Sequence, residues 1–108
     1  MRHPATQGRA DANHRAVADA IRLLGYPVKD LSRNGDGVED LLVGLHGRSR
    51  EPWWIVCEIK VPKPERSKVN PLQFTRAQIE WRRRTEAWPR ITVTSAQDAV
   101  NQIRAMTG

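Results

Sequence analysis

Residues 53–61 have the sequence WWIVCEIKV and form the most apolar run in the chain. A short run of this kind, rich in β-branched and aromatic residues, predicts a buried β-strand over Trp53–Val61. Successive side chains of a strand point to opposite faces of its sheet. Ile55, Cys57, Ile59 and Val61 therefore share one face, which we expect to pack into a core.

Glu58 and Lys60 leave the opposite face of this strand, two residues apart. A carboxylate or an ammonium group buried alone in so apolar a strand is costly unless it pairs or serves a site. A second strand is predicted over Val38–Leu45, and antiparallel pairing with Trp53–Val61 would bring Asp40 close to Glu58. We expect these three polar side chains to form a site, the alternative being a cross-strand ion pair between Glu58 and Lys60 at the surface.

The flanking segments predict an α/β domain. Helices are expected at residues 11–24, at Arg76–Glu86 and after Ser95, and further strands at Val28–Leu31 and Arg90–Thr94. Three consecutive strands followed by a helical crossover favour a mixed sheet with helices on both faces. The prediction is a three-layer αβββαβ core with a C-terminal helix, formed by one domain over residues 11–108 and preceded by a flexible arm at residues 1–10.

Positive charge is concentrated in one stretch of the chain. The net charge is +6, and residues 60–84 hold eight Lys or Arg against two Glu. Such a patch suits a polyanion because neutralised phosphates release counterions, although a solubilising surface is the alternative. The residues that we expect to bind DNA are Lys63, Arg66, Lys68, Arg76, Arg82, Arg83 and Arg84.

The cellular compartment follows from two absences in the sequence. No apolar run is long enough to span a bilayer, and the N-terminus has no signal-peptide pattern, so we expect no membrane association. The single cysteine, Cys57, cannot form an intramolecular disulfide. We therefore expect a cytoplasmic protein.

Asp40 followed by Glu58-Ile59-Lys60 resembles the motif of the PD-(D/E)XK nuclease superfamily. The runs Asp40-Leu41-Leu42-Val43-Gly44 and Phe74-Thr75-Arg76-Ala77-Gln78 are similar to stand-alone phage VRR-NUC nucleases, which are related to Holliday-junction resolvases. The similarity covers about residues 11–100. It implies a restriction-endonuclease-like fold in a bacterial or phage-infected cell.

The resemblance also implies a role for each residue of the site. Asp40 and Glu58, with the backbone carbonyl of Ile59, would bind Mg²⁺ or Mn²⁺, and Lys60 would be the catalytic lysine. Gln78 matches a glutamine that lies beside the metal site in the family. Its alternative role is that of capping-box partner of the residue before the helix, and we expect its side chain to serve only one role at a time.

Two positions depart from the family pattern. Glu39 stands where the motif has a proline, and we expect no consequence because its side chain points away from Asp40. Many relatives have a glutamate on the first helix where this chain has Asn13-His14. His14 could replace that glutamate as a metal ligand, the alternative being an ordinary residue on the helix surface.

The expected activity is that of a Mg²⁺- or Mn²⁺-dependent endodeoxyribonuclease without an organic cofactor. By resemblance, the substrate is branched DNA such as a Holliday junction, and the enzyme is a homodimer. Alternatives are flap, nicking or restriction-like cleavage, or a non-catalytic DNA-binding module that retains the fold. Four tryptophans could stack on unpaired bases, although packing is their more common use: Trp53, Trp54, Trp81 and Trp88.

Overall fold

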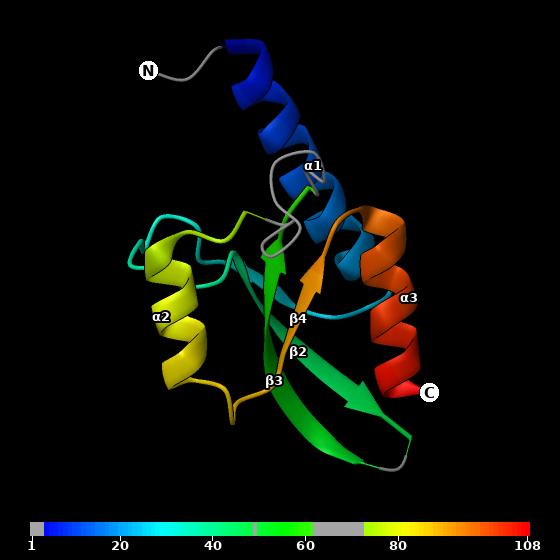
Figure 1. The fold of residues 1–108 in the computed structure, drawn as a ribbon. Coiled ribbons are helices and arrows are strands. Elements are labelled where there is room, and N and C mark those ends of the chain that lie inside the picture. The colour runs from blue at the N-terminus through cyan, green and yellow to red at the C-terminus, as the bar shows by residue number, and fades with distance from the viewer. Residues whose placement is uncertain (1–3, 49, 62–72) are drawn as a thin grey trace.

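A computed structural model of the chain describes residues 4–48, 50–61 and 73–108, with only the backbone described for residues 4–11. The elements follow one another in the predicted order of helix, three strands, helix, strand and helix (Figure 1). They are α1 (Pro4–Leu23), β1 (Val28–Asp30), β2 (Leu41–Gly47), β3 (Arg50–Ile59), α2 (Arg76–Arg84), β4 (Arg90–Val93) and α3 (Ala96–Thr107). The predicted α/β class is confirmed.

The strands form one mixed sheet in the order β1-β2-β3-β4. β1, β2 and β3 pair antiparallel, whereas β4 lies parallel to β3. The antiparallel pair of β2 and β3 needs only a short hairpin, but the parallel pair needs a longer crossover, which contains α2. The order of elements, a hairpin followed by a helical crossover, therefore produces the mixed sheet that the sequence predicted.

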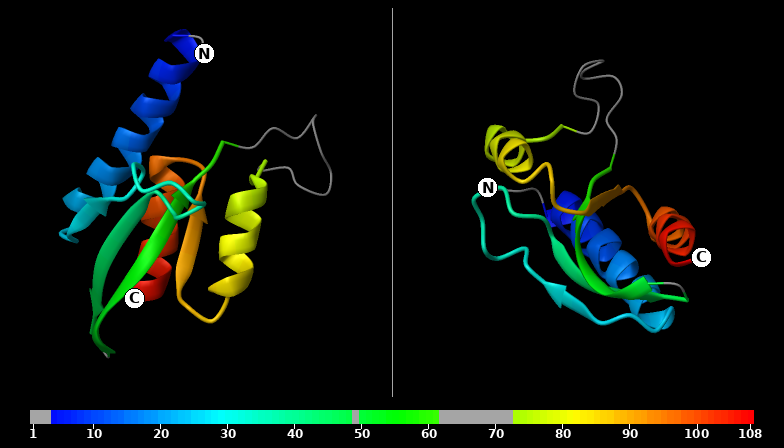
Figure 2. Two further views of the ribbon diagram at one scale, coloured as in Figure 1. Left: turned by 90° about the vertical axis from the view of Figure 1, so that its left-hand side faces the viewer. Right: turned by 90° about the horizontal axis from the view of Figure 1, so that it is seen from below.

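Helices cover both faces of the sheet (Figures 1 and 2). α1 and α3 contact each other on one face, and α2 lies on the other. Between the sheet and the α1–α3 pair lies the hydrophobic core: Val17, Ala18, Ile21, Leu41, Val43, Leu45, Ile55, Cys57, Ile91, Val93, Ala99 and Ile103. Leu41, Val43 and Leu45 of β2 are buried there, in the alternation that a strand requires. None of the residues of α2 is fully buried, so this helix forms a thinner outer layer.

Element boundaries depart from prediction at the N-terminus. α1 begins at Pro4 rather than near Asp11, so the backbone of residues 4–10, where we expected an arm without regular structure, is helical. Proline is tolerated in the first helical turn, where its missing N–H has no partner to lose. Ala5, Ala10 and Ala12 have the highest helix propensity of any residue type and extend the helix without an apolar stripe.

The predicted strands were also displaced. β2 begins at Leu41 rather than Val38, because the segment before it forms a loop closed by a bond from Leu31 N to Asp40 O of 2.7 Å. β3 runs from Arg50 to Ile59, so Val61 lies beyond the strand and is 57 % exposed. The expectation that Val61 packs into the core was therefore wrong.

The loop before β2 passes close to the start of α2. Gly37 in this loop has φ of 79°, and a Cβ there would lie 2.4 Å from the carbonyl oxygen of Ala77. Only glycine fits both the left-handed backbone and the close approach. Gly37 thereby lets the first turn of α2 lie against the loop that carries Asp40.

Candidate active site

Two acidic side chains meet where β2 and β3 pair. The register places Leu41 opposite Cys57, so Asp40, just before β2, approaches Glu58 near the end of β3. Asp40 Oδ2 accepts a hydrogen bond of 2.8 Å from the backbone N–H of Ile59. The structure thus brings Asp40 and Glu58 together, as antiparallel pairing predicted.

Glu58 is almost fully buried, with 3 % of its surface exposed. Burial raises the pKa of its carboxyl group to about 9, with further contributions from a side-chain hydrogen bond with Asp40 and from the charge of that carboxylate. The positive charge of Lys60 opposes the shift. Two adjacent carboxylates in a water-poor site repel each other, so the pair favours a bound proton or a bound cation.

Gln78 connects Glu58 to Lys60. Its Nε2 donates to Glu58 Oε2 at 2.8 Å, and its Oε1 accepts from Lys60 Nζ at 2.8 Å. The same Oε1 accepts from the backbone N–H of Thr75 at 2.9 Å, and Thr75 Oγ1 accepts from the Gln78 N–H at 3.1 Å, which completes the capping box. The expectation of one role at a time was wrong, because an amide has separate donor and acceptor atoms and its oxygen has two lone pairs.

Lys60 lies one residue beyond β3, but both its backbone and its ammonium group make hydrogen bonds. Its backbone N–H donates to Val93 O at 2.8 Å, which continues the pairing with β4. Its Nζ donates to Gln78 Oε1 and, at 3.3 Å, to the carbonyl oxygen of Gln73, and it lies 5.3 Å from the centre of the Phe74 ring. The segment that leads into α2 therefore directs the ammonium group toward the Glu58 face.

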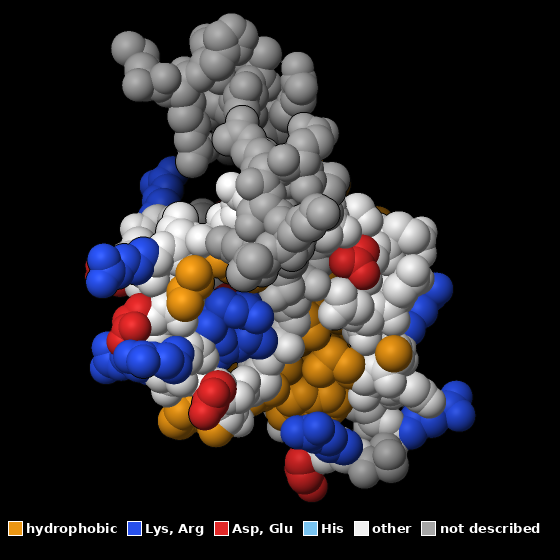
Figure 3. Space-filling view, viewed as in Figure 1, with side chains coloured by type: hydrophobic (Ala, Val, Ile, Leu, Met, Phe, Trp, Pro, Cys, Tyr) orange, Lys and Arg blue, Asp and Glu red, His pale blue; other side chains and the backbone are white. Residues whose placement is uncertain are grey.

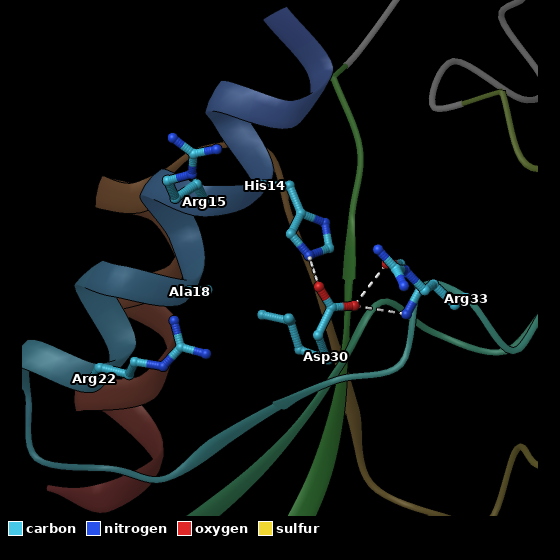
Figure 4. Close-up of a pocket in the computed structure, with 8 residues that line it drawn as sticks. His14, Arg15, Ala18, Arg22, Asp30 and Arg33 are labelled. Atoms are coloured by element: carbon cyan, nitrogen blue, oxygen red, sulfur yellow. Dashed lines mark hydrogen bonds and ion pairs between the residues drawn. The ribbon is translucent and has the colours of Figure 1, made fainter. Parts of the chain in front are cut away.

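Among the described contacts, His14 pairs with a third acidic residue rather than with Asp40 or Glu58. It points from α1 to Asp30, with Nε2 3.2 Å from Asp30 Oδ2, in a pocket of about 430 Å³ that Arg15, Arg22 and Arg33 also line (Figure 4). Hydrogen bonds from the Ser32 side chain and backbone, followed by the charge of His14, hold the pKa of Asp30 below its usual value. Within the described ranges, no group of three or more His, Cys, Asp or Glu side chains is placed to hold a metal ion. His14 therefore forms no such cluster with the acidic pair of β2 and β3.

The structure describes only four of the seven basic residues that were predicted to bind DNA. Lys63, Arg66 and Lys68 lie outside the described residues.

The other four predicted basic residues belong to α2. Arg82 donates to Thr92 Oγ1 at 3.2 Å and lies over the Phe74 ring, and Arg83 pairs with Glu80 at 2.9 Å. Arg76 and Arg84 are exposed.

Glu39 has a role that sequence reasoning missed. It is only 2 % exposed, its Oε1 accepts from Trp81 Nε1 at 2.8 Å, and its Oε2 lies 3.5 Å from Arg90 Nη1. The side chain thereby ties α2 and β4 to the start of β2. We expected no consequence at this position, but Glu39 anchors the layer that carries Gln78. Trp81 is 42 residues away in sequence, so no local pattern reveals the contact.

Two further findings concern membrane-spanning helices and similarity to known proteins. None of the helices in the described part of the chain is long and apolar enough to cross a membrane. No protein-family model matches the chain, and neither a curated protein nor a solved structure matches it. The grounds for a function are therefore the side chains of the site and their geometry.

Proposed function

We propose that this protein is a divalent-metal-dependent DNA endonuclease with Asp40, Glu58 and Lys60 as its catalytic residues. The observation that carries the proposal is the connected set of Glu58, Gln78 and Lys60 beside Asp40, brought together where β2 begins, where β3 ends and in the first turn of α2. A buried carboxylate with a strongly raised pKa, next to a second carboxylate and a positioned lysine, is typical of catalytic sites. A solvent-exposed ion pair would require none of this burial.

The donor set fits a hard divalent cation. Asp40 and Glu58 offer carboxylate oxygens side by side, and the repulsion between them would be relieved by a cation. These two residues, with the backbone carbonyl of Ile59, would hold Mg²⁺ or Mn²⁺. When bound, such an ion would polarise a phosphate and lower the pKa of a water molecule.

Lys60 would stabilise the negative charge that develops on the phosphate during hydrolysis. Its ammonium group is already oriented by Gln78 Oε1 and the carbonyl of Gln73, so little reorganisation is needed when the substrate binds. Gln78 acts here as a positioning residue, because it touches both Glu58 and Lys60 and restrains the distance between them.

We propose branched DNA as the preferred substrate and a homodimer as the active form, so that two sites can cut two strands. The test is cleavage of a labelled four-way junction beside a linear duplex of the same sequence, with Mg²⁺, Mn²⁺ or EDTA. Metal-dependent cutting that favours the junction and is lost in Glu58→Ala supports the proposal. Glu80→Ala is the matched control, since it removes an exposed carboxylate of α2 that pairs only with Arg83 among the described contacts.

An absence of cutting with either metal would contradict the proposed activity. DNA binding that is tight, indifferent to EDTA and unchanged by Glu58→Ala would then favour a non-catalytic DNA-binding module. Metal-dependent cutting without preference for the junction would keep the enzyme and overturn the branched substrate, and a substrate panel with flap and nicked DNA would identify the specificity.

A further inference from the structure

The structure separates the four tryptophans into two pairs. Trp53 packs against the hydrophobic core with Arg50 over its ring at 4.0 Å, and Trp81 is held by Glu39. Trp54 and Trp88, in contrast, are 60 % and 65 % exposed. Two large aromatic side chains thus remain largely accessible at the surface.

Trp54 and Trp88 line the same groove. It has a volume of about 570 Å³ and lies between the sheet and the end of α2, with Leu42 and Val56 from the strands and Pro89 from the connection to β4. The ring of Trp54 comes close to Gly44 on the neighbouring strand, where an added Cβ would lie 3.2 Å from Trp54 Cζ3. The missing side chain at Gly44 gives the indole room to lie against β2.

The groove shares its sheet face with the candidate active site. Trp54, Val56 and Glu58 are alternate residues of β3 and therefore project from the same face. At about 3.3 Å per residue, Trp54 and Glu58 are about 13 Å apart along the strand, which a few nucleotides of a single strand can cover. α2 borders both places, since Gln78 is in its first turn and Arg84, at its end, lines the groove.

The surroundings of the groove are positively charged. A second hollow of about 600 Å³ adjoins Trp88, and the two hollows together are lined by four arginines and two glutamates, a net charge of +2. These residues are Arg50, Arg82, Arg84, Arg90, Glu39 and Glu86. Figure 3 shows Lys and Arg side chains next to hydrophobic ones over α2.

This charge decides between two occupants of the groove. Two copies of the face would bring their positive surroundings together, which disfavours association, whereas a nucleic acid strand supplies phosphates. Aromatic side chains beside arginines are the usual means of binding single strands, because every base has a face that can stack.

We propose that the groove of Trp54 and Trp88 stacks the unpaired bases of single-stranded DNA, with the surrounding arginines close to its phosphates. The inference rests on the proposed function in one respect: among branched DNAs, it favours those in which an unpaired segment, such as a flap, lies next to the cut. Binding itself needs neither metal nor cleavage, so the two proposals can fail separately.

The test is the affinity for a short labelled oligothymidylate, measured by fluorescence anisotropy in EDTA beside a blunt duplex. Trp54→Ala and Trp88→Ala should each weaken oligothymidylate binding about tenfold, and phenylalanine at either position should restore most of it, because a ring that stacks is retained. Leu23→Ala is the control, because Leu23 is 88 % exposed at the end of α1.

Unchanged affinity in both alanine variants, with unfolding midpoints like that of the wild type, overturns the inference. If the two alanine variants sediment with a lower mass than the wild type but bind oligothymidylate with unchanged affinity, the inference is also overturned. The groove is then an interface between two copies of the chain. Weakened binding in the tryptophan variants supports the inference even if no DNA is cut, in which case only the proposed endonuclease activity fails.

Discussion

The two faces of the sheet differ although the same strands form both. On the face toward α1 and α3, Val43, Ile55 and Cys57 are fully buried among other apolar side chains. On the face toward α2, Glu58 and Gln78 form a polar network in a layer without a fully buried helical residue. One face holds the fold together by apolar burial, and the other holds polar groups that cost stability to bury.

Cys57 and Glu58 show the contrast between neighbouring residues. Burial raises the pKa of the Cys57 thiol to about 12, with the charges of Asp40 and Glu58 contributing, so the thiol stays neutral and behaves as a small core residue. Glu58 faces the opposite way and keeps a carboxyl group where an apolar residue would be more stable. Sites of function are commonly where a protein departs from the most stable choice.

The largest effect is expected at Lys60. Lys60→Ala should slow single-turnover cleavage of DNA by at least about a hundredfold, because it removes the positive charge that we propose stabilises the phosphate, while folding and DNA binding persist. Lys29→Ala, an exposed lysine of β1, serves as the control. Cleavage by Lys60→Ala at the wild-type rate would mean that Lys60 is not a catalytic residue.

The core face should dominate stability. Ile55→Ala is expected to lower the free energy of unfolding by about 2–5 kcal/mol, because it leaves a cavity in a packed core. Val56→Ala, the next residue on the opposite and only half-buried face, should cost less than half as much. Urea denaturation of both variants measures the difference, and equal losses would contradict the division of the sheet into a stabilising face and a functional face.

Gln78 should separate the catalytic role from the capping role. Gln78→Ala removes the contacts to Glu58 and Lys60 and should reduce the cleavage rate about tenfold while costing about 1 kcal/mol of stability through the lost cap. Thr75→Ala removes only the Thr75 side of the capping box and should cost similar stability without that fall in rate. Parallel rates in the two variants would assign Gln78 to the helix cap alone.

The smallest effect concerns the pH dependence of stability. Glu58 has a folded-state pKa of about 9 against an ordinary value of 4.5, so the unfolded chain loses its proton first and stability falls as the pH rises between these values. In EDTA, Glu58→Gln should therefore raise the unfolding midpoint by about 5 °C near pH 8 and change it little near pH 4. A variant that is less stable than the wild type near pH 8 would show that the buried carboxylate is not strained.

The sequence predicted that Asp40 and Glu58 lie together, because this proximity depends on two local features of the chain. Strand alternation fixes which side chains share a face, and the hairpin between β2 and β3 fixes which residues lie opposite each other. The α/β order followed from the same periodic patterns. These features depend on residues that are near one another in the chain.

The contacts that α2 makes could not be predicted in this way. Gln78 reaches Glu58 and Lys60 only because the crossover sets α2 over the sheet, and Glu39 meets Trp81 across 42 residues. Neither contact has a periodic signal. The anchoring role of Glu39, and the fact that Gln78 makes both of its expected sets of contacts at once, therefore emerged from the structure alone.

The most direct measurement is calorimetric titration of the protein with Mn²⁺. The proposed site predicts a binding event that is lost in Asp40→Asn and in Glu58→Gln and retained in Glu80→Gln, which alters only an exposed carboxylate of α2. Binding of Mn²⁺ to Glu58→Gln with the affinity of the wild type would contradict the assignment of the α2 face as a metal-dependent catalytic centre.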